Sequence, residues 1–113
     1  LSYKVALKRE KETNYRIIRK KTLKTEKLET VLKKYMPRNQ KVDILNIDAE
    51  GIDYSILMSN NWEAFRPKVI VVEDANFLLE EPTKSRIFNF LKKKNYSFLA
   101  KTDVSLIFKD NFI

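Results

Sequence analysis

Two short apolar runs, each closed by acidic residues, constrain the fold of this chain more than any other feature. Residues 42–48 are VDILNID and residues 68–73 are KVIVVE. The first has Ile44, Leu45 and Ile47 in a strand pattern, and the second is a continuous β-branched run typical of strands buried on both faces of a parallel sheet. The sequence therefore predicts two parallel strands whose carboxyl ends both carry acids.

The segments that follow these runs alternate between helix and strand patterns. Residues 52–59 and 83–94 have apolar side chains at helical spacing, and the positions expected to face the core are Ile52, Ile56, Leu57, Ile87, Phe88 and Leu91. Residues 96–101 and 104–109 predict two strands joined by a tight turn. This order predicts an α/β fold with parallel strands and a C-terminal antiparallel hairpin.

The first 41 residues form a basic segment beside a nearly neutral remainder. They hold 14 Lys and Arg against 4 Asp and Glu, whereas residues 42–113 hold 9 against 11. At this length one domain, residues 1–113, is expected, with an α/β core at 42–113. The basic charge also leaves open a non-catalytic module that binds nucleic acid or an acidic polymer.

The patterns within the basic segment are weaker. Residues 3–7 and 15–19 predict short strands, and residues 8–13 predict a loop. A helix is expected to begin after Thr25, acting as the N-cap, and to end at Tyr35 before Pro37.

Composition excludes several classes of chemistry. The chain has no Cys and no His, which excludes thiol nucleophiles, Ser-His-Asp triads and imidazole metal ligands. Its single glycine excludes Gly-rich phosphate loops. The longest apolar run is far shorter than the roughly 20 residues that cross a bilayer. The lack of Cys is compatible with a reducing compartment, and a cytoplasmic location is expected.

Acid–base chemistry is expected at one edge of the sheet. Asp48 and Glu50 follow the first strand, and Glu73 and Asp74 end the second. Ligands of open α/β sheets bind outside the carboxyl ends of the strands. An alternative is that these acids only stabilise the N-termini of the following helices.

The same residues carry a family resemblance. Residues 42–57, VDILNIDAEGIDYSIL, resemble the motif of FkbM-type S-adenosylmethionine-dependent methyltransferases, in which an apolar strand leads into D-x-E-G and an acid two residues later. Residues 66–73, RPKVIVVE, are similar to the next strand of that family, and residues 22–32 to its preceding helix. Asp53 stands where the family usually has Glu, and Asn95 where it usually has Gly. The resemblance covers residues 20–109.

The resemblance implies a partial class I, Rossmann-like methyltransferase sheet. Class I strands are ordered 3-2-1-4-5-7-6, so residues 42–48 would be the fourth strand, with its edge open where the first strand would pair. The chain would then be the C-terminal portion of a methyltransferase domain, or a degenerate paralogue, and would lack the half that binds the donor.

The resemblance also implies a function. A methyl group would pass from S-adenosylmethionine to a hydroxyl of a small molecule, a glycan or a polyketide-type acceptor. Asp48 and Glu50 would orient or deprotonate that hydroxyl, and Glu73 and Asp53 would contact the acceptor. Gly51 would let the backbone turn tightly beside the cofactor.

Another interpretation remains open for the acids at this edge. Asp48-Ala49-Glu50 is also similar to the D-x-D-type motif with which glycosyltransferases hold a divalent metal, and Glu73, Asp74 and Asn76 would be further oxygen ligands. No metal site is favoured over the methyltransferase interpretation.

Residues 77–79 are either packing residues or a lip of the acceptor site, and packing is expected for them and for Trp62.

Overall fold

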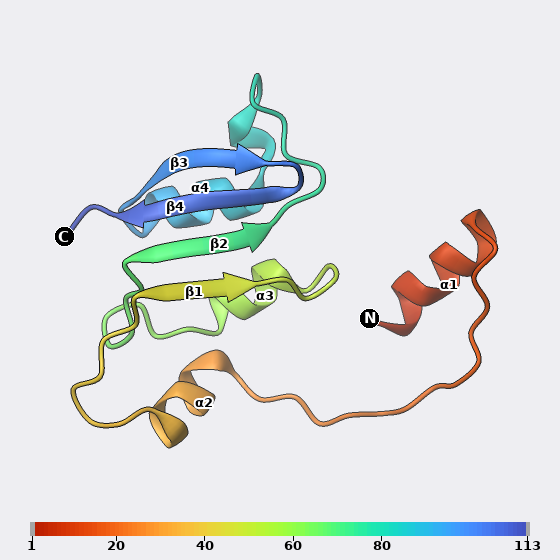
Figure 1. Ribbon diagram of the computed structural model, residues 1–113, viewed down its shortest axis with the longest axis horizontal. Helices are drawn as coiled ribbons and strands as arrows, with labels where there is room; N and C mark the ends of the chain where they lie inside the picture. The colour runs from red at the N-terminus through yellow and green to blue at the C-terminus, as the bar shows by residue number, and fades with distance from the viewer. Residues whose placement is uncertain (1, 113) are drawn as a thin grey trace.

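A four-stranded sheet forms the centre of the protein, whose computed structural model describes residues 2–112 (Figure 1). The strands are β1 (Ile44–Ile47), β2 (Val69–Glu73), β3 (Tyr96–Thr102) and β4 (Ser105–Asp110). They lie in the order β1-β2-β4-β3, with β1 parallel to β2 and β4 antiparallel to both β2 and β3. The predicted parallel pair and C-terminal hairpin are both confirmed.

Two helices cover one face of this sheet. α3 (Asp53–Met58) connects β1 to β2, and α4 (Arg86–Lys93) lies between β2 and β3; both stand behind the strands in Figure 1. The helix predicted over residues 83–94 is divided, because Pro82–Lys84 forms the 3₁₀ helix η1. Ser85 then begins α4, and its hydroxyl accepts a hydrogen bond from the Phe88 N–H at 3.0 Å.

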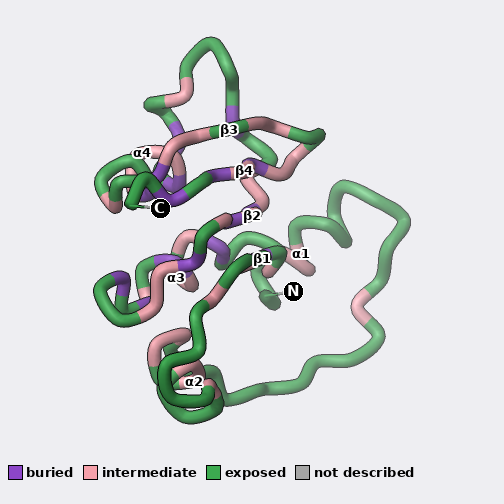
Figure 2. Tube along the Cα trace, turned by 60° about the vertical axis from the view of Figure 1, so that its left-hand side comes forward, coloured by how far each residue is buried: buried purple, intermediate pink, exposed green. Residues whose placement is uncertain are grey.

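The core lies between these helices and the sheet. Its buried apolar residues are Ile47, Leu57, Trp62, Ile70, Val72, Phe77, Ile87, Leu91, Tyr96, Leu106 and Phe108. The inward positions predicted for α4 are confirmed, as is packing by Trp62, whose indole N–H donates to the Leu57 carbonyl at 2.9 Å. Figure 2 shows that burial is concentrated in β2, β4 and the helices α3 and α4.

Some predicted packing positions are wrong. Ile52 is exposed, because α3 begins only at Asp53 and Ile52 still belongs to the preceding turn. Phe77 is buried, but Leu78 and Leu79 are exposed on the loop that leads to η1.

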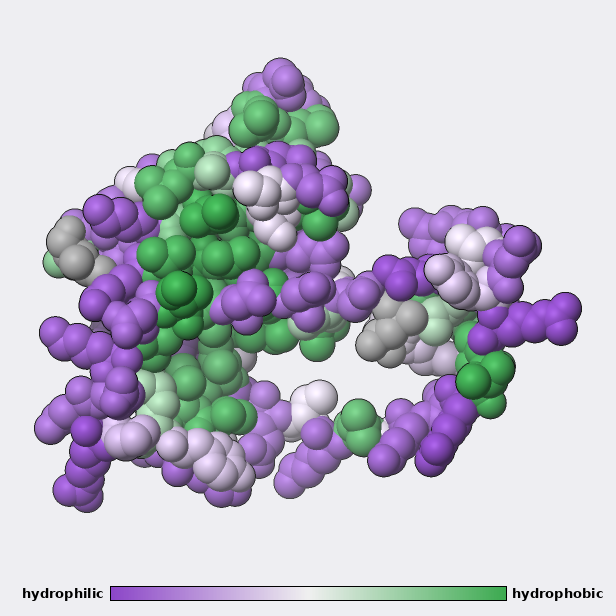
Figure 3. Space-filling model, viewed as in Figure 1, coloured by the Kyte–Doolittle hydropathy of each residue, from purple (hydrophilic) through white to green (hydrophobic). Residues whose placement is uncertain are grey.

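The opposite face of the sheet carries no helix among residues 2–112. Strand residues alternate between the two faces, so Ile44, Val69, Val71 and Ile107 point away from the helices. Ile44 is exposed and the other three are half-buried. Figure 3 shows hydrophobic side chains gathered on this face of the sheet.

The N-terminal segment differs most from the sequence prediction. Residues 3–7 and 8–13, predicted as a strand and a loop, instead form one helix, α1 (Tyr3–Glu12). The Ser2 hydroxyl accepts a hydrogen bond from the Val5 N–H at 3.3 Å and caps it. Most of its residues are Ala, Leu, Lys, Arg and Glu, which favour helix, and this outweighs a weak alternation over five residues.

The strand predicted at residues 15–19 is also wrong. These residues form no strand and pair with none in the structure. The second predicted helix exists as α2 (Leu28–Tyr35), but Thr25 does not cap it. Instead Ser59, at the end of α3, accepts hydrogen bonds from the N–H groups of Leu28 at 2.9 Å and Glu29 at 3.2 Å. A tertiary contact therefore sets the start of α2.

Arg66 contacts β3, β4 and the end of α4, at the end of the sheet opposite Asp48 and Glu73. Its guanidinium donates to both carboxylate oxygens of Asp110, at 2.5 and 3.2 Å, and to the Lys94 carbonyl at 3.0 Å. It also lies 4.8 Å from the centre of the Tyr96 ring and 4.7 Å from that of Phe112. The hydrogen bond with Arg66 lowers the pKa of Asp110 against the opposing effect of burial.

Candidate functional site

The turn between β1 and α3 is held by Asp53. This residue is buried, and its carboxylate accepts hydrogen bonds from the N–H groups of Ala49 at 3.0 Å and Gly51 at 3.1 Å. Glu50 and Gly51 both have positive φ, 53° and 98°. Glycine suits such a conformation because it has no Cβ. Since both of its oxygens are engaged, Asp53 positions the turn that carries Asp48, Glu50 and Gly51.

The carboxyl groups of Asp48 and Glu73 lie side by side. Asp48 directly follows β1 and Glu73 ends β2, at adjacent register positions of these paired strands. Burial, together with the neighbouring carboxyl groups of Asp48, Asp53 and Glu50, raises the pKa of Glu73. Asp48 and Glu73 therefore form a carboxyl pair.

A cavity of about 330 Å³ opens beside this turn. Its walls come from α1, the turn, the start of α3, the end of β2 with the following loop, and α4. The lining residues are Val5, Arg9, Glu50, Gly51, Asp53, Tyr54, Glu73, Asp74, Ala75, Asn76 and Ile87. The structure thus brings Glu50, Gly51, Asp53 and Glu73 to one cavity. Asp48 is not among the lining residues and lies next to Glu73 at the end of β1.

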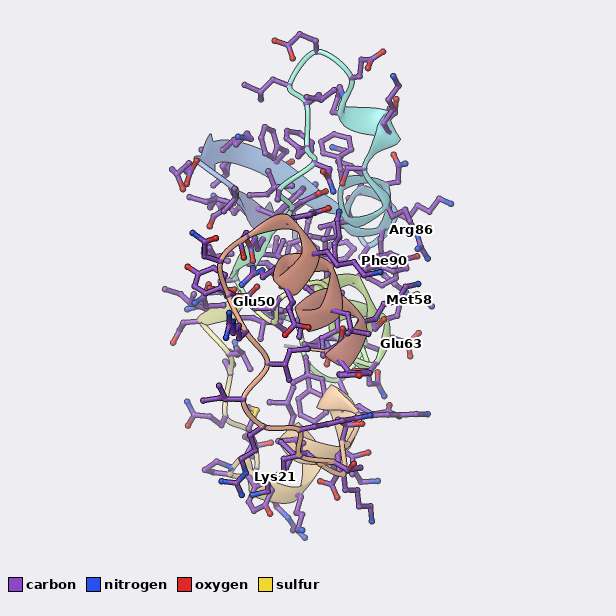
Figure 4. All side chains as sticks on the ribbon, turned by 90° about the vertical axis from the view of Figure 1, so that its right-hand side faces the viewer. Lys21, Glu50, Met58, Glu63, Arg86 and Phe90 are labelled. Carbon is purple, nitrogen blue, oxygen red and sulfur yellow. The ribbon has the colours of Figure 1, made fainter. Side chains whose placement is uncertain are left out.

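Arg9 closes one side of the cavity, a contact that the sequence did not predict. Its guanidinium donates to the Glu50 carboxylate at 2.6 Å, and both side chains are about half exposed. Figure 4 shows Glu50 beside α1. A Cβ on Gly51 would lie 3.9 Å from Val5. Arg9 is 41 residues from Glu50 and lies in a basic run, so no local pattern distinguishes it.

Asp74 takes part in the start of α4. The Ser85 hydroxyl donates to its carboxylate at 2.5 Å, and the same hydroxyl caps α4. Within residues 2–112 no three carboxylate, His or Cys groups are arranged to hold a metal ion. No helix of this part of the chain is long and apolar enough to span a membrane.

Replacing Glu73 with glutamine is expected to stabilise the protein at pH 7. Folding raises the pKa of Glu73, so ionisation of this carboxyl group destabilises the native state relative to the unfolded state. The stabilisation that Glu73 provides is fully present below the ordinary glutamate pKa and is lost as the pH rises through the raised pKa. The gain in the Glu73→Gln variant should therefore grow from pH 4 to pH 8 in urea unfolding experiments.

The exposed Glu80 offers a matched control for this variant. Glu80→Gln should leave the free energy of unfolding nearly unchanged at every pH. A Glu73→Gln variant that is less stable than the wild type at pH 8 would contradict the assignment of a strained carboxyl pair.

Comparison with known proteins identifies the family. The family model of the methyltransferase FkbM domain matches residues 2–98, most of the chain. The match begins at residue 2, before the start at residue 20 that the resemblance led us to expect, so it includes the basic N-terminal segment. It ends at residue 98, before β4. No curated protein and no solved structure matches the chain. The extent of the family match shows that this chain belongs to the methyltransferase FkbM domain family.

Proposed function

We propose that this chain forms the acceptor-facing part of an S-adenosylmethionine-dependent O-methyltransferase with a class I fold. The observation that carries the proposal is the meeting of Glu50, Gly51 and Glu73 around one cavity, with Asp48 beside Glu73 at the adjacent strand end. The strand order β1-β2-β4-β3 agrees with the 4-5-7-6 half of the class I order. The family match supports methyl transfer as the class of reaction.

The residues that line this cavity suit only part of the methyl donor, S-adenosylmethionine. Carboxylates suit its positively charged sulfonium and amino groups, and the turn at Gly51 lets a ligand approach the backbone closely. The cavity contains no second glycine, and β1 has no strand on its outer side within residues 2–112. These residues do not hold the whole of S-adenosylmethionine, so we assign them to the acceptor.

The carboxyl pair supplies what a hydroxyl acceptor requires. Glu73 stands beside Asp48 at the ends of the paired strands, and its raised pKa favours its protonated form. Asp48 then accepts a hydrogen bond from the acceptor O–H and takes its proton, which leaves the oxygen more nucleophilic. The acceptor is a small molecule, a glycan or a polyketide-type compound that presents a hydroxyl.

Glu50 and Gly51 have different roles in this proposal. Glu50 lies at the rim of the cavity, where it contacts the acceptor and helps to orient it. Gly51 keeps the turn in its left-handed conformation, because any side chain there is strained at φ 98°.

The test follows a labelled methyl group into the product. The protein, as its own gene encodes it, is incubated with methyl-labelled S-adenosylmethionine and a panel of sugar, phenol and aliphatic hydroxyl acceptors. The proposal predicts a base-stable methyl ether as product, and a rate that falls in a Gly51→Ala variant because its turn is strained. Label recovered only as a base-labile ester or a methylamine would contradict O-methylation.

A further inference from the structure

Two leucines stand in water on the loop that joins β2 to α4. This loop, residues 74–85, is called the leucine loop below. Leu78 is 52% exposed and Leu79 is 59% exposed, although Phe77 directly before them is buried. Figure 1 shows the loop rising beside β3, at the edge of the sheet opposite β1. A strand added to β1 would therefore lie at the far edge of the sheet from these leucines.

Hydrogen bonds fix the leucine loop at its ends and at its tip. The Ser85 hydroxyl donates to the Asp74 carboxylate at 2.5 Å and so joins the two ends. At the tip the Glu81 N–H donates to the Leu78 carbonyl at 3.2 Å, and the Glu81 carboxylate pairs with Lys84 at 2.5 Å. The loop therefore has one defined path.

Phe77 anchors the same loop in the core. The centre of its ring lies 5.4 Å from that of Phe98 and 5.9 Å from that of Phe88. With Phe77 held inward and the following turn hydrogen-bonded, Leu78 and Leu79 cannot reach the core without breaking these contacts. An apolar pair that a fixed loop keeps in water marks a binding surface more than a packing accident.

The leucine loop begins in the wall of the cavity already described, because residues 74–76 line it. Sites for small molecules are lined mostly by apolar side chains, with a few polar groups that orient the ligand. Among the residues that line this cavity, Val5 and Ile87 are the only aliphatic side chains larger than alanine. Leu78 and Leu79 extend this polar cavity with the apolar surface that it otherwise offers sparingly.

Size and charge favour an alkyl chain over other occupants of this surface. Two leucine side chains expose far less than the about 800 Å² per partner that a stable protein interface buries. Glu80 and Glu81 follow the leucines directly, and their negative charges oppose contact with an anionic membrane surface. An alkyl chain needs only a narrow apolar strip, which two adjacent leucines provide.

We propose that Leu78 and Leu79 form an apolar lip that binds an alkyl chain of the acceptor while the acceptor hydroxyl lies at the cavity. This inference rests on the proposed function and narrows its acceptor class. The acceptor is an amphiphilic hydroxyl compound with an extended alkyl chain, in place of a free sugar or a small phenol.

Binding of n-alkyl glucosides tests the lip, because these compounds present the same hydroxyls and differ only in chain length. In isothermal titration calorimetry, below the critical micelle concentration, octyl glucoside should bind with a Kd about tenfold or more below that of butyl glucoside. A double variant, Leu78→Ser with Leu79→Ser, should bind both with nearly equal Kd. Met58→Ser is the control, since Met58 is 57% exposed on α3 and lies away from the leucine loop (Figure 4). All three side chains are exposed, so every variant should keep its fold, which urea unfolding checks.

Methyl transfer to the same glucosides separates this inference from the proposed function. With methyl-labelled S-adenosylmethionine, kcat/KM should be about tenfold or more higher for octyl than for butyl glucoside in the wild type and in Met58→Ser, and nearly equal in the double variant. Equal Kd or equal kcat/KM for the two glucosides in the wild type overturns the lip and leaves O-methylation standing. Chain-length-dependent binding that the double variant abolishes, without a methyl ether on any hydroxyl, supports the lip and contradicts the proposed function.

Discussion

Replacing Asp48 with asparagine is expected to lower the rate of methyl transfer by about 100- to 10,000-fold, the usual range for loss of a general base. The substitution keeps the size and hydrogen-bonding capacity of the side chain but removes its ability to take a proton. Asp48 is exposed, so the variant should keep its fold.

Asp43 is the matched control for this experiment. It precedes the same strand at its amino end, is exposed, and pairs with Lys68 at 2.6 Å. Asp43→Asn should retain full methyl transfer. Comparable losses in the two variants, or full activity in Asp48→Asn, would show that Asp48 is not the base.

Replacing Arg66 with alanine is expected to cost about 3–5 kcal/mol of stability, as is typical when one partner of a buried ion pair is removed. Asp110 is 4% exposed and would lose both hydrogen bonds from the guanidinium. The Lys94 carbonyl and the faces of Tyr96 and Phe112 would also lose their contact with it. Urea unfolding at pH 7 measures the change.

Lys68→Ala removes a surface ion pair two residues away and provides the comparison. Lys68 and Asp43 are both largely exposed, so this change should cost less than about 1 kcal/mol. Equal losses in the two variants would contradict the central role of Arg66 in the fold.

The pH dependence of the Arg66 variant follows from the pKa of Asp110. Folding lowers that pKa, so the contribution of Asp110 to stability is present above the ordinary aspartate pKa and is lost as the pH falls through the lowered value. Without Arg66 this lowering is lost, and the variant should show a shallower fall in stability on acidification than the wild type.

The second half of the chain could be predicted from its sequence because its signals are local. The β-branched run of β2 and the apolar spacing of α4 each fix one element within a few residues, and the turn at Thr102 and Asp103 fixes the hairpin. The acids at the ends of β1 and β2 could be placed together for the same reason, since parallel strands bring their carboxyl ends to one edge.

The rest depended on contacts between distant residues. The alternation at residues 3–7 is too short to separate strand from helix, and capping by Ser2 decides it. Residues 15–19 have a strand-type sequence, but a strand also needs a partner, and none of the strands within residues 2–112 pairs with them. The ion pairs of Arg9 with Glu50 and of Arg66 with Asp110 span 41 and 44 residues and have no local signature.

The most direct test of the proposed site is photolabelling with methyl-tritiated S-adenosylmethionine, because it reports the position of the transferred group without requiring the acceptor. Tryptic cleavage releases residues 42–68 as one peptide that contains Asp48, Glu50, Gly51 and Asp53, since Arg66 precedes Pro67. It releases residues 69–84, with Glu73, as the next. The proposal predicts label in one or both peptides and its loss when S-adenosylhomocysteine competes. Competed label confined to other peptides would contradict the placement of methyl transfer at this edge of the sheet.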